Sequence, residues 1–210
     1  MNKDPQLRKS YGTPLVLTLN GREQMVSPAS DWLYSYDETG KELWRTHTIP
    51  KPGEPGNESW GNIPYEKRRP VGTWMVPSYD PQLNLIYIGT SVTSPAPKFM
   101  LDGNDKTYLY HNCTLALNAD TGAQLWVFDP RTYEEGPPMS GTGLNSRGVA
   151  FWRGDNGEIR LFIAGRQRLF AVDAKTGRPI EEFGGRGAAA LNENLSRDVP
   201  RLHTQTTSPP

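Results

Sequence analysis

Short apolar or alternating runs, separated by turn-forming residues, recur along the whole of this 210-residue chain. One phrase is written three times: "LYSYDETGKELW" (Leu33–Trp44), "LALNADTGAQLW" (Leu115–Trp126) and "LFAVDAKTGRPIEEF" (Leu169–Phe183). Such runs, bounded by Asp, Asn and Gly, are typical of short strands joined by tight turns. Helical periodicity is scarce, and its best stretch, Arg186–Arg197, lacks an apolar stripe. The pattern predicts an all-β protein.

Each copy of the phrase predicts a β-hairpin. An Asp or Asn side chain starts the turn by bonding backbone two residues on, and a glycine closes it with a positive φ. On the return strand of the first two copies stands a tryptophan, Trp44 or Trp126, and we expect Trp126 to pack between repeated units. The third copy has Glu181 in that slot, with Phe183 two residues later. The three turns centre on Thr39-Gly40, Thr121-Gly122 and Thr176-Gly177.

A further strand pair is predicted before each hairpin, with turns at Asn20-Gly21, Asp80-Pro81 and Gly154–Gly157. Each unit therefore has four antiparallel strands, and a period of roughly 40–50 residues is that of a propeller blade. Turn chemistry also recurs by chance in all-β proteins. The agreement of the strand pairs, the tryptophans and the spacing favours a shared unit, present about three times.

Composition excludes several classes of function. Lys plus Arg number 23 and Asp plus Glu number 23, so no charge footprint for nucleic acid or a membrane surface exists. Cys113 is the single cysteine, which excludes an intramolecular disulfide and a cysteine-based metal site. His47, His111 and His203 show no ligand spacing. The N-terminus has no apolar run of the secretory type, and no stretch reaches the length of a membrane span.

Two longer stretches of sequence indicate a particular family of β-propeller proteins. "GTWMVPSYDPQLNLIYIGTS" and "NSRGVAFWRG…RLFAVDAKTGRPIEEFGGRG" resemble blades of the PQQ-dependent (quinoprotein) alcohol and glucose dehydrogenases, an eight-bladed β-propeller family. The resemblance covers about Gly72–Pro210, whereas Tyr11–Arg45 is similar only to the generic PQQ-like repeat. It implies a periplasmic enzyme that oxidises a primary alcohol or sugar. Electrons would pass to pyrroloquinoline quinone (PQQ) and on to a cytochrome c or a quinone.

The same resemblance implies four cofactor contacts. Trp74 matches the family's stacking tryptophan, Thr73 the hydroxyl beside it, and Arg147 the arginine that pairs with the quinone. Thr207 lies where the family places another cofactor-contacting threonine. PQQ is a flat ring with three carboxylates, which suits an aromatic platform and a guanidinium fork. Three of the four also have a plain structural reading: Trp74 in a core, Arg147 capping a turn, and Thr207 as a β-branched strand residue.

Departures from the family pattern are equally informative. Calcium serves that family as a Lewis acid, but Val92 stands in the apparent position of an asparagine ligand, and hard cations prefer oxygen. No catalytic aspartate and no carboxylate metal ligand is recognisable, and without a Cys-x-x-Cys-His any haem belongs to a partner. The order of two blades is also inverted. In this chain the blade with Arg147-Gly148 follows the blade with Thr73-Trp74, whereas in the family it precedes it.

We therefore expect a partial or rearranged member of the family, with further blades supplied from another chain as one option. The alternative is a non-catalytic PQQ-like repeat module for protein interaction or scaffolding. The expected segments are an N-terminal tail (1–10), a PQQ-like blade (11–49), a Pro/Gly-rich insertion loop (50–71), a quinoprotein-type blade (72–130, with a loop at 94–111), a second such blade (131–187) and a connector into a next blade (188–210).

Overall fold

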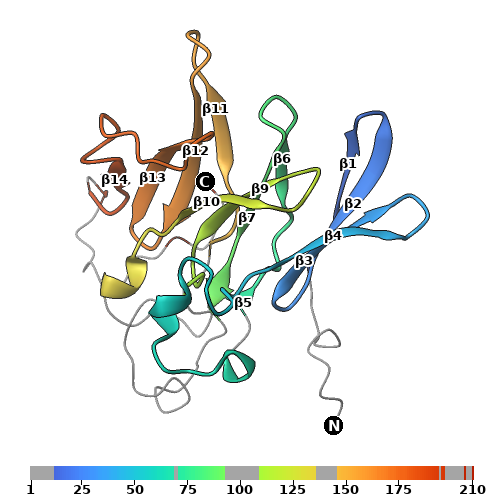
Figure 1. Ribbon diagram of the computed structural model, residues 1–210. Helices are drawn as coiled ribbons and strands as arrows, with labels where there is room; N and C mark the ends of the chain where they lie inside the picture. The colour runs from blue at the N-terminus through green and yellow to red at the C-terminus, as the bar shows by residue number, and fades with distance from the viewer. Residues whose placement is uncertain are drawn as a thin grey trace.

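A computed structural model of the chain describes residues 12–68, 71–92, 109–135, 146–193, 195–196, 206 and 210. Three four-stranded antiparallel sheets lie side by side, with a two-stranded ladder beneath the middle one (Figure 1). The described residues form short 3-10 helices but no α-helix. None of these helices is long and apolar enough to cross a membrane. The predicted all-β class, with three four-stranded units, is confirmed. The stretch with the best helical pattern instead contributes a short strand, β14 (Ala188–Ala190).

The sheets follow the chain in order. The first has the strand order β1-β2-β3-β4, the second β10-β9-β7-β6 and the third β11-β12-β13-β14. Their strands are β1 (Leu15–Leu19), β2 (Arg22–Pro28), β3 (Trp32–Asp37), β4 (Glu42–His47), β6 (Ser78–Asp80), β7 (Leu85–Gly89), β9 (Thr114–Asn118), β10 (Gln124–Phe128), β11 (Ala150–Arg153), β12 (Ile159–Gly165) and β13 (Arg168–Asp173); the ladder pairs β5 (Val71–Gly72) with β8 (Ser91–Val92).

The Thr-Gly turns form as predicted. In the first, one oxygen of Asp37 accepts from the Thr39 amide at 2.9 Å, the Thr39 hydroxyl at 2.6 Å and the Lys41 amide at 2.9 Å. Asn118 and Asp173 accept from the turn threonines of the other two copies. The glycine of each turn has φ between 69° and 84°, a region that other residues enter only at a cost.

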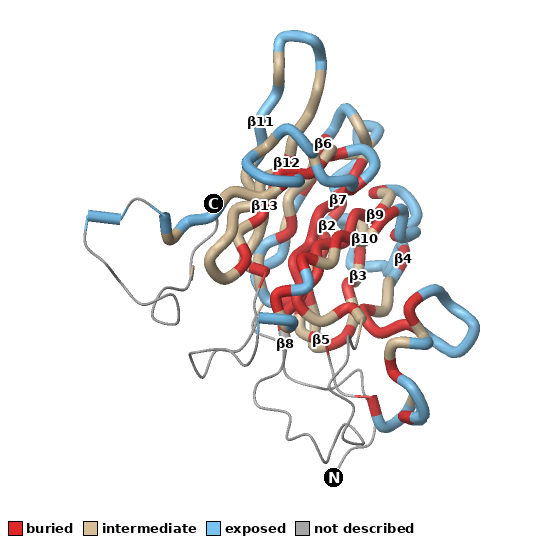
Figure 2. The backbone as a smooth tube through the Cα atoms, turned by 90° about the vertical axis from the view of Figure 1, so that its left-hand side faces the viewer, coloured by how far each residue is buried: buried red, intermediate tan, exposed pale blue. Residues whose placement is uncertain are grey.

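Two apolar cores separate the three sheets, because the strands of the middle sheet alternate between them. On β7, Ile86 and Ile88 face the first sheet, while Leu85 and Tyr87 face the third. The middle sheet is consequently buried on both faces, as the red tube in Figure 2 shows, whereas the β11–β12 hairpin projects into solvent. Each outer sheet is packed on one face only within the described part of the chain.

Two tryptophan side chains connect neighbouring sheets by packing and hydrogen bonding. The indole nitrogen of Trp44 on β4 donates to the carbonyl of Ala119 in the turn of the second sheet, at 3.0 Å. A Cβ placed on Gly122 of the same turn would come within 2.4 Å of that ring. The second junction repeats the arrangement with Trp126, Ala174 and Gly177, at 3.2 Å for the hydrogen bond and 2.6 Å for the Cβ. The expectation that Trp126 packs between units is confirmed, and Trp44 does the same.

The Pro/Gly-rich insertion differs from the surface loop expected for it, because it has a core of its own. It contains two short 3-10 helices, η2 (Asn57–Trp60) and η3 (Tyr65–Lys67), and the fully buried Trp60 at the end of η2 packs with Ile49, Ile63 and Val71. Arg68, itself buried, donates to the carbonyl of Pro50 at 2.5 Å and to the side chain of Asn57 at 2.7 Å. A buried guanidinium with acceptors on both sides holds the two ends of the segment together.

Candidate functional site

Two of the four predicted site residues meet in the structure. The guanidinium carbon of Arg147 lies over the ring of Trp74, 4.9 Å from its centroid. Trp74 stands just before β6 and Arg147 just before β11, so the contact joins the entries of the second and third sheets. Trp74 is 38% exposed, which rules out its being a core residue. A cation above an exposed indole face is an attractive cation–π arrangement.

The third predicted residue, Thr73, is buried against the first sheet. Its hydroxyl donates to the carbonyl of Ala29 at 2.9 Å and has the Trp32 carbonyl within 3.4 Å. Ala29 lies in the turn between β2 and β3, and Trp32 is the first residue of β3. Thr73 is only 1% exposed, so it anchors the backbone at the neighbouring Trp74. The fourth, Thr207, lies outside the described residues.

A related link, in which the donor is a backbone amide, recurs at the entry to the third sheet and again near the end of the chain. Ser146, which precedes Arg147, donates its amide to the Thr90 carbonyl at 3.1 Å. Thr206, which precedes Thr207 in the sequence, donates its amide and its hydroxyl to the Arg166 carbonyl, both at 2.7 Å. In all three cases the acceptor lies between the second and third long strands of the preceding sheet.

Trp74 and Arg147 therefore each follow a residue that is hydrogen-bonded to the preceding sheet. The two side chains lie at equivalent points, just before the second and the third sheet. This equivalence was not visible in the sequence, because Thr73, Ser146 and Thr206 share no motif.

The electrostatics at the pair favour an anion. Arg147 makes no ion pair with any other residue that the structure describes, so its charge is available to a ligand. Guanidinium groups bind carboxylates through paired donors in a plane. The indole of Trp74 offers a flat apolar face beside this charge. Together they suit a flat, negatively charged molecule.

A metal site is not evident. Within the described ranges, no three His, Cys, Asp or Glu side chains are grouped so that they could hold an ion. Val92 forms part of β8, where its backbone pairs with that of Val71. Burial raises the pKa of the Cys113 thiol well above its usual range, so this group stays protonated and is no ligand.

Comparison with known proteins decides the family. A family model described as "Glucose/ethanol/alcohol dehydrogenase, beta-propeller domain", for PQQ proteins, matches residues 15–130 and again 103–210. The chain belongs to this family. Its three sheets are blades of the PQQ-type β-propeller, and the tryptophan junctions join successive blades.

Curated relatives are much longer than this chain. Quinohemoprotein alcohol dehydrogenase ADH-IIG of Pseudomonas putida is 35% identical over 111 residues, which are 46% of this chain and 15% of that protein. The dehydrogenase subunit of alcohol dehydrogenase (quinone) from Gluconobacter oxydans is 29% identical over 162 residues, 68% of this chain and 21% of that protein. The chain thus spans about a fifth of these relatives or less.

Solved structures agree on the architecture. The crystallised ADHIIG from Pseudomonas putida HK5 superposes with a TM-score of 0.55 at 25% identity, over 78% of this chain and 26% of that one. The quinohemoprotein alcohol dehydrogenase of Comamonas testosteroni gives a TM-score of 0.55 at 20% identity, over 84% of this chain and 29% of that one, which supports the fold.

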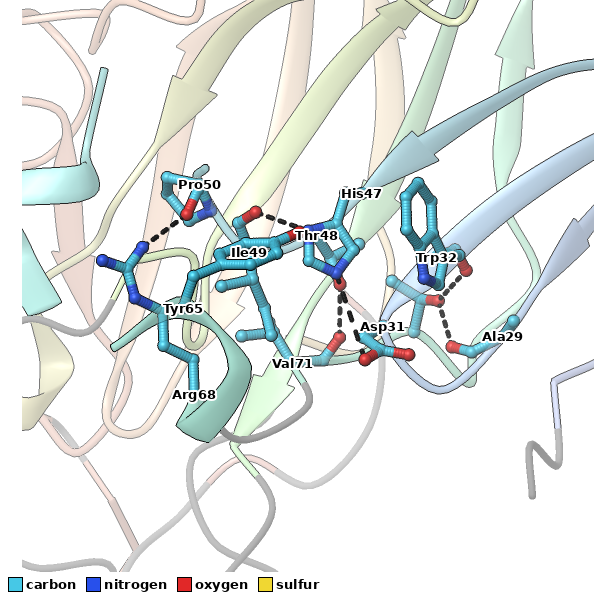
Figure 3. Close-up of polar contacts among 11 residues, drawn as sticks. Ala29, Asp31, Trp32, His47, Thr48, Ile49, Pro50, Tyr65, Arg68 and Val71 are labelled. Carbon is cyan, nitrogen blue, oxygen red and sulfur yellow. Dashed lines mark hydrogen bonds and ion pairs between the residues drawn. The ribbon is translucent and has the colours of Figure 1, made fainter. Parts of the chain in front are cut away.

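Sequence reasoning missed one polar cluster next to the site, formed by Asp31, His47 and Tyr65. Their positions lie on a turn, at the end of β4 and on η3, and no spacing rule connects them. They meet only because the insertion folds back on the first sheet (Figure 3).

Proposed function

We propose that this chain forms part of a PQQ-binding propeller that oxidises a primary alcohol or a sugar, with electrons passed to PQQ. The observation that carries the proposal is the contact between Trp74 and Arg147 at adjoining blade entries. Membership of the family supports the class of reaction. Substrate, acceptor and location belong to the proposal, because the chain covers a small share of its relatives.

The residues present fit PQQ on chemical grounds. Its fused rings need a flat apolar surface, and Trp74 exposes one. Its carboxylates and quinone oxygens would need hydrogen-bond donors, and the guanidinium of Arg147, which lies over the indole of Trp74, would supply them. When bound, PQQ supplies two-electron oxidation of a C–H/O–H pair.

Each residue then has a distinct part. Trp74 would hold the ring on its flat face, and Arg147 would bind a carboxylate or quinone oxygen and so orient the ring. Thr73 has an indirect part. Its hydroxyl donates to the Ala29 carbonyl, and this hydrogen bond holds the backbone next to Trp74 in place. Thr207 is a proposed fourth contact that rests on the resemblance. We assign no step to calcium, because the described residues offer no ligand group for it.

For the complete protein we propose a periplasmic location and a cytochrome c or a quinone as electron acceptor. The names of relatives support these acceptor types: one is an alcohol dehydrogenase (quinone) subunit, and another is the lupanine 17-hydroxylase [cytochrome c] of a Pseudomonas species. No aspartate that could act as general base for the substrate hydroxyl is recognisable from the sequence. Cofactor binding is therefore the property to test first.

The test is a titration of the purified chain with PQQ, with and without calcium, followed by the quinone absorbance and by indole fluorescence. We expect saturable binding that Trp74→Ala abolishes. The chain offers a matched control in Trp152, an exposed indole on β11 with Arg160 5.0 Å from its centroid. Trp152→Ala should bind PQQ like the wild type. Dye-linked ethanol oxidation is the second readout. Absence of saturable binding, or equal binding by all three proteins, would favour the non-catalytic module.

A further inference from the structure

His47 occupies an unusual position at the edge of the first blade. Its Nδ1 lies 2.7 Å from the carbonyl oxygen of Ile49 and 2.8 Å from the hydroxyl of Tyr65. Its Nε2 lies 4.0 Å from a carboxylate oxygen of Asp31, and both side chains are buried, at 9% and 5% exposure. The ring also packs on Trp32, with centroids 4.2 Å apart.

These partners define the protonation state that fits. A carbonyl oxygen can only accept, so Nδ1 must carry a proton to bond Ile49. At 4.0 Å the carboxylate of Asp31 is beyond hydrogen-bond reach of Nε2, but its negative charge favours a positively charged ring, with a proton on Nε2 as well. The imidazolium, with protons on both nitrogens, is the form that matches both neighbours. Tyr65 then accepts from Nδ1 rather than donating to it.

The turn that His47 contacts is the one on which the site rests. Asp31 lies between Ala29 and Trp32, whose carbonyls face the Thr73 hydroxyl. The backbone carbonyl of Asp31 accepts from the amide of Thr48 at 2.9 Å. The Thr48 side chain donates in turn to the Val71 carbonyl at 2.8 Å, two residues before Thr73 (Figure 3).

We propose that His47, as an imidazolium, is a positioning residue that clamps the Ala29–Trp32 turn and so fixes Trp74 opposite Arg147. Loss of the Nε2 proton as the pH rises turns a nitrogen lone pair toward Asp31. The clamp then loosens, and the backbone from Val71 to Trp74 loses part of its support. The bearing of this clamp on PQQ rests on the proposed function, whereas the clamp itself does not.

Several charged groups surround this cluster and enter the titration. Asp31 faces His47 from the turn. Arg45 on β4 and Lys51 in the insertion both lie over the Trp32 ring, at 5.5 and 5.8 Å from its centroid. Near Tyr65 stand Glu54, Glu66 and the buried Arg68. Burial, reinforced by Glu54 and Asp31, raises the pKa of Tyr65, so its hydroxyl stays neutral over the working range.

The experiment follows ring nitrogens by NMR and amide exchange of residues 71–74, from about pH 5 to 8, without PQQ. With three histidines in the chain, His47→Gln assigns the signal. We expect exchange of these amides, corrected for its intrinsic pH dependence, to speed up on the order of tenfold as the His47 signal becomes neutral. In His47→Gln this step should vanish. Lys175→Gln, which removes one positive charge from an exposed turn of the third blade, should keep it.

Two further variants keep the test decisive should His47→Gln fail to fold. Asp31→Asn should leave a histidine signal that becomes neutral at lower pH, and Thr73→Val should exchange fast at every pH while His47 still titrates. A His47 ring that stays neutral throughout, or amides that ignore its state, overturns the proposal. PQQ titration of the wild type is scored separately. PQQ binding without a His47 effect rejects the clamp alone, and a His47 effect without PQQ binding rejects the proposed function alone.

Discussion

The indole of Trp44 covers Gly122 so closely that a methyl group on that glycine would come within 2.4 Å of the ring. The glycine therefore has two reasons to be there: φ of 70° and the absence of any space for a side chain. The pair explains why the Thr-Gly phrase and its tryptophan recur together. The tryptophan of one blade needs the glycine of the next.

Gly122→Ala should lower the free energy of unfolding by about 3 kcal/mol or more, since left-handed strain adds to overpacking. Gly157 is the control, because its φ is 81° but no atom lies within 4 Å of the added Cβ. Gly157→Ala should cost only about 1 kcal/mol. Urea unfolding measures both, and equal losses would contradict the account of the junction.

Trp126→Ala should destabilise the protein by about 3 to 5 kcal/mol. It removes a buried ring from the second core and its hydrogen bond to the Ala174 carbonyl. The neighbouring Leu125 is 57% exposed, and Leu125→Ala should change stability by no more than about 0.5 kcal/mol. A small effect at Trp126 would mean that the second and third blades are not joined through this residue.

The sequence was sufficient for the strands, the turns and the blade count, because these follow from local rules. Asp37 and Gly40 specify their turn whatever surrounds them. Hydrogen-bond partners that are brought together only by tertiary packing could not be predicted from the sequence. Thr73 gave no sign that it would face Ala29, and the polar cluster around His47 depends on how the insertion folds. The contact of Trp74 with Arg147 could be anticipated only through the resemblance.

Arg68 makes the insertion a testable unit. Besides its hydrogen bonds, its guanidinium lies 5.5 Å from the centroid of the Trp60 ring and 5.8 Å from that of Tyr65. Arg68→Met keeps the volume but removes every donor, so residues 50–68 should open locally and become sensitive to protease. The blades should stay folded, as judged by far-UV circular dichroism. Exposed Lys67→Met is the control, and simultaneous loss of the blades would contradict an independent insertion.

His111 should make the protein less stable in acid. Its burial, beside Trp60 at 5.5 Å between ring centroids, lowers its pKa from 6.5 to about 4. The folded protein therefore keeps a neutral ring while the unfolded chain takes up a proton. Stability should fall as the pH drops from 6.5 to 4, by at most about 3 kcal/mol, and this contribution should be constant below that range.

His111→Phe, which keeps an aromatic ring against Trp60, should remove this slope. Comparison of the two proteins cancels the contribution of Asp129, whose pKa is raised by burial and which acts in the opposite direction. Unfolding in urea at several pH values gives the difference. A slope that persists unchanged in His111→Phe would assign the acid sensitivity to other groups.

Arg147→Lys separates charge from geometry in the proposed cofactor site. Lysine keeps the positive charge but lacks the planar fork that pairs with a carboxylate or neighbouring oxygens, and it stacks less well on an indole. We expect PQQ to bind on the order of tenfold more weakly, with Arg147→Ala weaker again. Arg160→Lys alters the matched pair with Trp152 and should leave binding unchanged. If lysine were equivalent to arginine at 147, the residue would attract the anion without orienting it, and the assigned role in orienting the ring would be wrong.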